Sequence, residues 1–264
     1  MTGSIGRVGL WVTDLDRMVE FYGDVIGLET LVRDGDRAVL GVDDPLLVLA
    51  AAPDRPARGV DETGLFHTAF RVPSRAALGD ALGRIERNWR LDGASDHRVS
   101  EALYLSDPED NGIEMYRDRP RSAWPTTDDG RVEMDTLPLG LDPLREAAGG
   151  ADRCPPGTDV GHVHLEVSSL DAARSFYADG LGLRVRQSMP GALFLAADDY
   201  HHHVGCNVWN GRSKPPEGRG LAWIELALDD AEAVASRVGG APTNRAGEVE
   251  ATDPDGITIR LRRA

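Results

Sequence analysis

The hydrophobic pattern of the first fifty residues predicts a strand, a helix and then three short strands. Apolar residues dominate Val8 to Val12, which is typical of a strand with little solvent exposure. Asp14 precedes residues 15–22, where apolar residues recur at i, i+3 and i+4, the spacing of a helix that packs one face on a sheet. Gly27 predicts the end of this helix, and turns such as Gly35-Asp36 separate short strands. The order of elements is therefore βαβββ.

The same order of elements recurs further along the chain, which indicates an internal duplication. Ser74 and Ser169 precede helical segments in the way that Asp14 does. The repeated segments are Gly6–Val12 with Gly161–Val167, Phe21-Tyr22 with Phe176-Tyr177, Gly64–His67 with Gly220–Trp223, and Asp107-Pro108 with Asp253-Pro254. The sequence therefore predicts an α+β fold of four βαβββ modules, in which one pair of modules has been duplicated.

The stretch between the two halves differs in composition from the modules. Residues 119–159 are rich in Pro and Gly and show little periodicity, as expected of a linker. We therefore predict an N-terminal half over residues 1–118, with modules one and two, and a C-terminal half over residues 160–264, with modules three and four.

Charge and composition argue against several classes of partner. The chain of 264 residues has a formal net charge of −15 and no run of Lys and Arg, which disfavours nucleic acid and an anionic membrane surface. No apolar run approaches the length that spans a bilayer, and the N-terminus lacks the pattern of a signal peptide. Two cysteines, Cys154 and Cys206, are too few for a disulfide framework. We therefore expect a cytoplasmic protein.

The histidines are distributed unevenly along the chain. Of the seven histidines, those between residues 161 and 209 are His162, His164 and the run His201-His202-His203, and the other two are His67 and His97. Two histidines on strands and one distant Glu are the ligands of a 2-His-1-carboxylate metal site, which leaves coordination positions open for substrate and dioxygen. A site of this kind is the chemistry that the pattern favours.

Comparison of the modules selects the ligand candidates. The equivalent position of each opening strand holds Arg7, His67, His162 and Trp223, so only modules two and three carry a histidine there. His164 lies two residues from His162 on the same face of the strand and could replace it as the ligand, although the alignment with His67 favours His162.

The far end of each module gives the same result. Glu114 aligns with Thr258 of module four, and the run His201-His202-His203 aligns with Leu46-Leu47-Val48 of module one. If the run lies on a strand, His202 points to one face and its two neighbours point to the other, so either His202 or its neighbours can reach a metal, but not both. The candidate chemistry therefore falls in modules two and three.

Several of these segments resemble one known family. The segments that carry the resemblance are Gly64–His67, Glu101–Pro108, Asn111–Tyr116, Gly161-His162 and Tyr200–Gly205. Together they resemble the vicinal oxygen chelate superfamily and, within it, the type I extradiol dioxygenases that open catechol rings. The resemblance covers nearly the whole chain.

The resemblance implies a fold, a reaction and a set of site residues. It implies paired modules that curl into cup-shaped mixed sheets, around Fe(II) held by His67, His162 and Glu114; the same ligands would also suit Mn(II). It implies that His202 is the active-site acid and base, since a non-ligating histidine can move protons near neutral pH. Tyr104 would bond a substrate oxygen, and His97 would contact the substrate. The partners would be a small aromatic diol and O2, and the protein could be a homo-oligomer.

In one respect the chain departs from the better-known members. Their ligand-bearing modules both lie in the C-terminal half, whereas here they are modules two and three, on either side of the linker. We therefore expect modules two and three to share a cup, with one and four pairing separately or with each other. Pairing within the halves would place His67 and Glu114 opposite Arg7 and break the ligand set.

Two other functions fit the same scaffold. The first is a glyoxalase-like metal-dependent lyase or isomerase, which typically uses four protein ligands and commonly a second Glu; Asn207 and its neighbours stand where that Glu would be expected. The second is a metal-free binding protein of the bleomycin-resistance type, which would not need an aligned His-His-Glu set. The sequence leaves the ring substituents of the substrate open.

Overall fold

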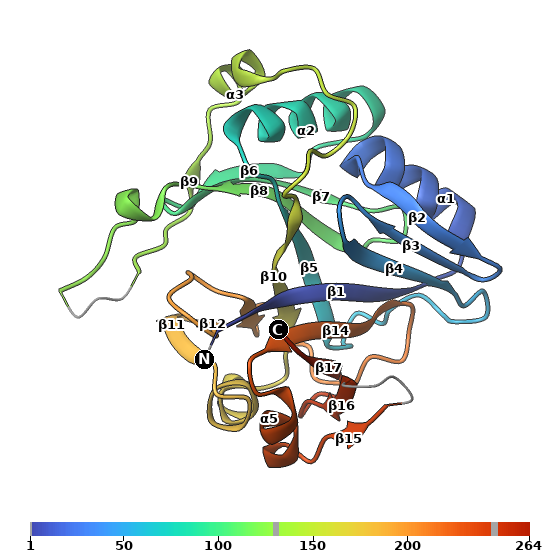
Figure 1. The fold of residues 1–264 in the computed structure, drawn as a ribbon, viewed down its shortest axis with the longest axis vertical. Coiled ribbons are helices and arrows are strands. Elements are labelled where there is room, and N and C mark those ends of the chain that lie inside the picture. The colour runs from blue at the N-terminus through green and yellow to red at the C-terminus, as the bar shows by residue number, and fades with distance from the viewer. Residues whose placement is uncertain (1, 129–131, 244–247) are drawn as a thin grey trace.

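A computed structural model describes residues 2–128, 132–243 and 248–264, and it divides the strands between two mixed sheets (Figure 1). The first sheet has eight strands, contributed by modules one and four. In spatial order they are β15 (Ala241–Pro242), β16 (Glu248–Thr252), β17 (Thr258–Arg263), β14 (Gly220–Leu228), β1 (Gly3–Val12), β4 (Pro45–Ala51), β3 (Arg37–Gly41) and β2 (Glu29–Asp34).

The second sheet has nine strands, and modules two and three supply most of them. In spatial order they are β11 (Arg184–Met189), β12 (Ala192–Ala196), β13 (Val204–Asn207), β10 (Asp159–Glu166), β5 (Gly64–Arg71), β8 (Gly112–Asp118), β7 (Ser100–Ser106), β6 (Gly93–Asp96) and β9 (Leu137–Pro138). The strand β9 belongs to the stretch predicted as a linker and extends the sheet at its edge.

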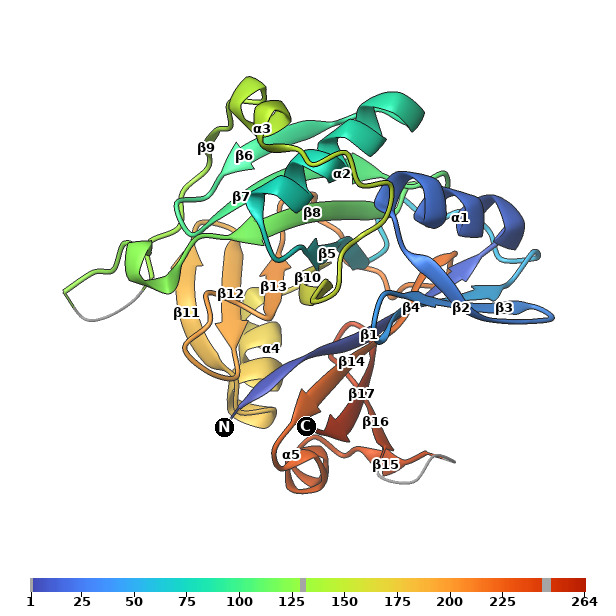
Figure 2. The same cartoon turned by 45° about the horizontal axis from the view of Figure 1, so that its top comes forward.

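The helices begin where the sequence predicts. Side chains of Asp14, Ser74 and Ser169 accept hydrogen bonds from backbone N–H groups of the first helical turns. The helical segments are α1 (Leu15–Phe21) with η1 (Tyr22–Ile26), α2 (Arg75–Asn88), η2 (Arg121–Ala123), α3 (Asp142–Ala147), α4 (Leu170–Ala173) with η3 (Arg174–Gly180), and α5 (Ala231–Arg237). In Figure 2, α2 and α3 lie side by side over the outer face of the sheet that contains β6, β7 and β8. None of the described helices is long and apolar enough to cross a membrane.

The pairing of the modules confirms the α+β fold and answers the question that the sequence left open. The strand β1 runs antiparallel to β14, which joins module one to module four. The strand β10 runs antiparallel to β5, which joins module three to module two. Modules two and three therefore share one sheet, and one and four share the other.

In each half, a Tyr from the Phe-Tyr repeat forms a buried hydrogen bond with the Asp of the Asp-Pro repeat. The Tyr22 hydroxyl donates to Asp107 at 2.9 Å, and the Tyr177 hydroxyl donates to Asp253 at 2.9 Å, all four groups being buried. Each bond links the helix of one module to the last hairpin of the next module. The Phe-Tyr and Asp-Pro repeats thus recur because they form the same contact twice.

The strand register corrects two of the predicted alignments. Val8 lies beside Leu47 whereas Val163 lies beside Val204, so the histidine run corresponds to residues 44–46 and not to Leu46-Leu47-Val48. Likewise Ala69 lies beside Glu114 whereas Glu225 lies beside Arg260, so Glu114 corresponds to Arg260 and not to Thr258. The segment before β13 is longer than the one before β4, so a constant spacing misplaces the histidine run. The turns before β8 and β17 have the same length, but Gly112-Ile113 opens β8 whereas Gly256-Ile257 still lies in the turn, so matching these two pairs misaligns Glu114.

Candidate metal centre

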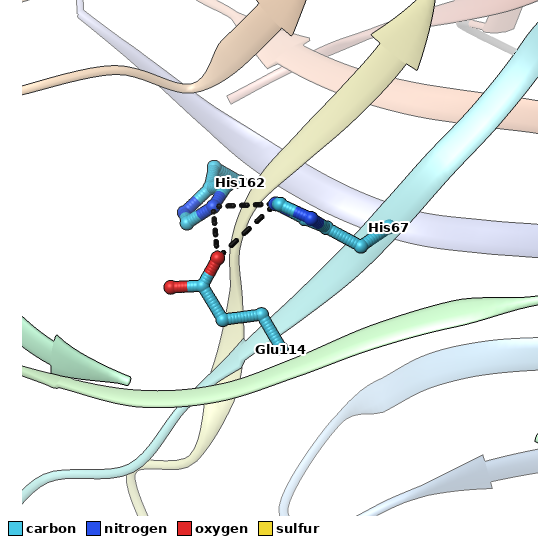
Figure 3. A group of neighbouring side chains, drawn as sticks. All are labelled: His67, Glu114 and His162. Atoms are coloured by element: carbon cyan, nitrogen blue, oxygen red, sulfur yellow. Dashed lines mark hydrogen bonds and ion pairs between the residues drawn. The ribbon is translucent and has the colours of Figure 1, made fainter. Parts of the chain in front are cut away.

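Three strands of the second sheet bring His67, Glu114 and His162 together (Figure 3). His67 Nε2 lies 3.3 Å from His162 Nε2, and Glu114 Oε2 lies 3.1 Å from the first and 3.2 Å from the second. All three side chains are buried. Among the described residues, they form the one group of His, Cys, Asp and Glu side chains whose geometry could hold a metal ion.

Two β-bulges aim these histidines at the cavity. Val160 pairs with Phe70 and His162 with Ala69, so Gly161 is an extra residue in β10. Because a bulge reverses the alternation of faces, Val160 lies in the core while His162 faces the cup. A second extra residue, Phe66 in β5, has the corresponding effect, and both Phe66 and His67 line the cavity.

Gly161 is required at its bulge by a close approach of the chain to Tyr116. A Cβ built at this position would lie 1.7 Å from the Tyr116 hydroxyl, which is itself 2.7 Å from the Tyr200 hydroxyl. Gly6 occupies the equivalent bulge of β1, where a Cβ would collide with the Glu225 carboxylate. The glycine that opens each repeat is therefore explained by packing at a bulge.

The three donor atoms fit one divalent ion in size and in protonation. Donors about 2.1 Å from one ion lie about 3.0 Å apart at right angles and about 3.4 Å apart in a tetrahedron, which brackets the observed triangle. Burial lowers the pKa of His162 to about 4, so its ring is neutral at pH 7. Burial opposes ionisation of Glu114, but His162 and His67 outweigh it and hold the pKa of the carboxyl well below its ordinary value. Neutral imidazoles and a carboxylate are the forms that bind metal.

His164 lies in the same cup, outside the donor triangle. Its ring packs against Phe66, Phe194 and Trp209, and it also meets the ring of His67 at a centroid distance of 5.1 Å. Its Nε2 atom is buried without a hydrogen-bond partner in the structure. Between the two histidines that the sequence left as alternatives, the geometry places His162, and not His164, against Glu114.

Besides Glu114, a second carboxylate is buried near the triangle, that of Glu166 on β10, and it is already bound by other side chains. Glu166 accepts hydrogen bonds from Arg58 at 2.8 Å and from Asn210 at 2.6 Å, and it pairs with Arg212 at 2.8 Å. These partners direct Glu166 away from the triangle, and Asn207, where a second acidic ligand was sought, is an amide. The described residues therefore offer three ligands, not the four of the glyoxalase-like alternative.

Tyr104 and His97 form a hydrogen-bonded pair on the cavity wall. Tyr104 lies directly across from Glu114 in the β7–β8 hairpin, and its hydroxyl is 2.6 Å from His97 Nε2. His97 Nδ1 lies 2.6 Å from the backbone carbonyl of Asp135, so a neutral His97 carries its proton on Nδ1 and accepts from Tyr104. Burial, followed by the charge of Glu114, raises the pKa of Tyr104 well above its ordinary value. The phenol therefore keeps its proton and can donate it in a hydrogen bond.

The histidine run does not lie on a strand, so the prediction that alternating strand faces separate His202 from its two neighbours is wrong. Strand β13 begins at Val204, and His201, His202 and His203 form an irregular bend before it in which all three are buried. His202 lines the cavity and packs on His162 at a ring centroid distance of 4.1 Å. His203 Nδ1 accepts from the backbone N–H of Ala197. Of the three, only His202 reaches the cavity, as predicted, but through the bend rather than through strand alternation.

Several functional contacts have no signal in the sequence. His201 Nδ1 lies 2.8 Å from His202 Nδ1, and His201 Nε2 lies 3.0 Å from Asp118 Oδ1. Asp118 Oδ2 accepts from the Tyr200 hydroxyl at 2.9 Å and from Arg71 at 3.1 Å. These groups come from β5, β8 and the bend before β13, and only the fold brings them together.

The cavity that contains the three candidate ligands has a volume of about 340 Å³. Its wall is largely apolar and aromatic, and none of the described residues lining it is Lys or Arg. The lining side chains outside the histidines, Tyr104 and Glu114 are Phe66, Ser95, Val99, Ser100, Met134, Asp135, Thr136, Met189, Phe194 and Trp209. Met134, Asp135 and Thr136 belong to the stretch predicted as a linker, which thus closes one side of the cavity.

The equivalent position in the first sheet holds a different cluster. Arg7, Trp223 and Arg260 replace His162, His67 and Glu114, and the guanidinium of Arg260 lies 4.2 Å from the centroid of the Trp223 ring. Glu225 pairs with Arg7 and, at 3.0 Å, with Arg262. Cations and an indole occupy the places where the second sheet presents its metal donors.

Comparisons with known proteins agree with this architecture. The protein family described as "Glyoxalase/Bleomycin resistance protein/Dioxygenase superfamily" matches this chain over residues 4–115 and 159–261. A curated relative, catechol-2,3-dioxygenase of Bacillus subtilis (strain 168), is 41% identical over an alignment of 249 residues, and the match covers 89% of this chain and 87% of that protein.

Solved structures match the fold over nearly the whole chain. Glyoxalase I from Zea mays has a TM-score of 0.65 at 16% identity and covers 99% of this chain and 92% of its own. A putative dioxygenase from Bacillus subtilis subsp. subtilis str. 168 has a TM-score of 0.64 at 13% identity, covering 100% of this chain and 86% of its own. The duplicated modules, the shared sheets and the family match lead to one conclusion: the chain belongs to the glyoxalase/bleomycin resistance protein/dioxygenase superfamily.

Proposed function

We propose that this protein is an extradiol ring-cleavage dioxygenase, which inserts O2 into a catechol-type aromatic diol at a 2-His-1-Glu non-haem metal centre. The observation that carries the proposal is the triangle of His67, Glu114 and His162 on the wall of a largely apolar cavity. Identity of 41% to a catechol-2,3-dioxygenase over most of both chains supports the same reaction. The enzyme is thus an oxidoreductase.

The metal and the protein residues have separate tasks. A divalent ion held by His67, Glu114 and His162 supplies open coordination positions for the diol oxygens and for O2. Fe(II) is the proposed ion, and Mn(II) suits the same donors. Tyr104 donates its hydroxyl proton to Nε2 of His97, so its phenol oxygen is left to accept a hydrogen bond from a hydroxyl of the bound diol. The apolar wall excludes bulk water from the reacting ring.

His202 is the proposed acid and base. Its ring lies against His162 and lines the cavity, within reach of a diol bound beside the metal donors. Burial, followed by the repulsion that a second positive charge would meet among the neighbouring histidines, lowers the pKa of His202 well below its ordinary value. A neutral ring is the form that can accept the second hydroxyl proton of the diol, and it returns that proton later in the reaction.

The cavity wall favours a catechol whose substituents carry no negative charge. None of the described wall residues provides a cation for a carboxylate, and the one acidic side chain besides Glu114 among them, Asp135, is paired with Arg98 at 3.4 Å. Phe66, Phe194 and Trp209 offer ring faces and edges to an aromatic substrate. We therefore propose alkyl-substituted or unsubstituted catechols as substrates, and a cytoplasmic location, which two free buried cysteines suit.

Oxygen uptake tests the proposed function. Protein reconstituted anaerobically with Fe(II) or Mn(II) is mixed with aerated catechol, 4-methylcatechol or 3,4-dihydroxybenzoate, and both O2 loss and the yellow ring-fission product are recorded. The proposal expects about one metal ion per chain and one O2 consumed per ring opened, with the methylcatechol preferred to the carboxylate. Binding of catechols without O2 consumption by either metal form would instead support a binding protein.

A further inference from the structure

A hydrogen-bonded chain leads from the proposed acid and base, His202, to a carboxylate behind the cavity. His202 Nδ1 lies 2.8 Å from Nδ1 of His201, and Nε2 of His201 lies 3.0 Å from Oδ1 of Asp118. Both rings are buried, so water does not compete for these bonds. This contact uses Nδ1 of His202, so it leaves Nε2 of the same ring for the cavity that His202 lines.

The carboxylate end of this chain is fixed from two sides. The second oxygen of Asp118 accepts from Arg71 Nη1 at 3.1 Å and from the Tyr200 hydroxyl at 2.9 Å. Arg71 is held in turn by Asp159, which accepts from its Nε atom at 3.0 Å. Burial opposes ionisation of Asp118, but the hydrogen bond from His201 and the charge of Arg71 outweigh it and keep the pKa of Asp118 below its ordinary value.

An ionised Asp118 determines where the protons lie when both rings are neutral. A carboxylate only accepts hydrogen bonds, so His201 must carry its proton on Nε2. The Nδ1 atom of His201 then has a lone pair and accepts from Nδ1–H of His202. His202 is left with an unprotonated Nε2, the atom that a general base needs.

We propose that Asp118 and His201 are positioning residues that fix the tautomer of His202, so that its Nε2 is unprotonated toward the cavity. The inference rests on the proposed function, because His202 needs this tautomer only if it accepts a proton from the substrate. Neither positioning residue lines the cavity.

The substitution Asp118→Asn should reverse the direction of the hydrogen bonds between residue 118, His201 and His202 with little change in side-chain shape. The amide oxygen must face Arg71, which can only donate, so the amide nitrogen faces His201 and donates to its Nε2. His201 then carries its proton on Nδ1 and donates to His202, which is left protonated on Nε2. The variant should therefore disfavour the base form of His202 without altering the metal donors.

A matched control is available on the other side of Arg71. Asp159→Asn also removes one negative charge beside this guanidinium, but Asp159 has no contact with the two histidines among the described interactions. Tyr200→Phe removes one of the donors to Asp118 and leaves the bond from His201 in place. Both variants should keep the wild-type tautomer of His202.

The experiment measures turnover and tautomers in the wild type and these variants. We expect Asp118→Asn to lower kcat about 10- to 100-fold while KM and the metal content stay within about 2-fold, because only the proton acceptor is affected. Asp159→Asn should keep kcat within about 3-fold. Wild-type kcat in Asp118→Asn would overturn the proposal.

Nitrogen NMR reads the tautomer without turnover and separates this inference from the proposed function. In ¹⁵N-histidine protein loaded with diamagnetic Zn(II), the signals lost in His202→Gln identify His202. We expect protonated Nδ1 in the wild type and in Asp159→Asn, and protonated Nε2 in Asp118→Asn. An unchanged pattern in Asp118→Asn overturns the inference, whereas the expected pattern in a protein that opens no catechol overturns only the proposed reaction.

Discussion

The bulge at Gly161 allows a quantitative test of how the fold positions His162. In Gly161→Ala the new Cβ would lie 1.7 Å from the Tyr116 hydroxyl, whereas ordinary contact begins near 3.4 Å. Tyr116 is fully buried and its hydroxyl is bonded to Tyr200, so it cannot move without losing that bond. Overpacking of this kind costs about 1–3 kcal/mol, and a lost hydrogen bond about 1 kcal/mol more. We predict destabilisation by about 2–4 kcal/mol and weaker metal retention.

Tyr116→Phe separates the collision from other effects of the alanine. Removing the hydroxyl leaves the ring carbon Cζ, at 2.8 Å, as the nearest atom, so part of the strain is relieved. Alone, Tyr116→Phe should cost about 0.5–1.5 kcal/mol, for one hydrogen bond. The double variant should be more stable than the sum of the single effects predicts, by about 1–2 kcal/mol, since the two positions are in contact.

Urea unfolding followed by tryptophan fluorescence measures these free energies. Gly93→Ala is the matched control, because a Cβ at Gly93 meets no atom within 4 Å, and it should change the stability by less than about 1 kcal/mol. If the effects of Gly161→Ala and Tyr116→Phe add within about 0.3 kcal/mol, the bulge adapts to a side chain and the packing explanation of the glycine is refuted.

Three further predictions concern the proposed reaction. His202→Phe should keep the metal and bind catechol yet slow ring opening about 10²–10⁴-fold, whereas His67→Ala should lose the metal together with activity, as metal analysis beside oxygen uptake will show. Tyr104→Phe should lower kcat/KM about 10-fold or more at unchanged metal content, for a lost hydrogen bond from a substrate hydroxyl, and an unaltered kcat/KM would remove Tyr104 from the reaction. Asp135→Asn should lower KM for 3,4-dihydroxybenzoate relative to 4-methylcatechol; an unchanged ratio would mean that Asp135 does not select against charge.

The sequence contained enough information to predict the modules and their pairing. The repeats around Gly6, Gly161, Tyr22 and Tyr177 mark contacts that the fold makes twice, so they survive in both halves. Pairing of modules two and three followed because the histidines and Glu114 had to meet. The boundaries at residues 118 and 160 stay a prediction, since strands of both halves share each sheet.

Other features could not be predicted, for identifiable physical reasons. The bend at His201 changes the spacing between modules, so a fixed offset aligned the histidine run with Leu46-Leu47-Val48. Glu114 was aligned with Thr258 instead of Arg260 because the Gly-Ile pairs at Gly112 and Gly256 look alike, although one opens a strand and the other lies in a turn. Met134 looked like linker because its contacts are to another part of the chain and leave no periodicity. Asp118 had no distinguishing neighbours in the sequence, and only the fold places it behind His202 through His201.

Anomalous diffraction at the iron edge tests the location of the metal centre most directly. For crystals of the Fe(II) protein grown anaerobically, we predict one iron peak per chain, about 2.0–2.3 Å from Nε2 of His67, Nε2 of His162 and a carboxylate oxygen of Glu114. A peak bound by His164 in place of His162, a peak between modules one and four, or no ordered iron in an active protein would contradict the proposed centre.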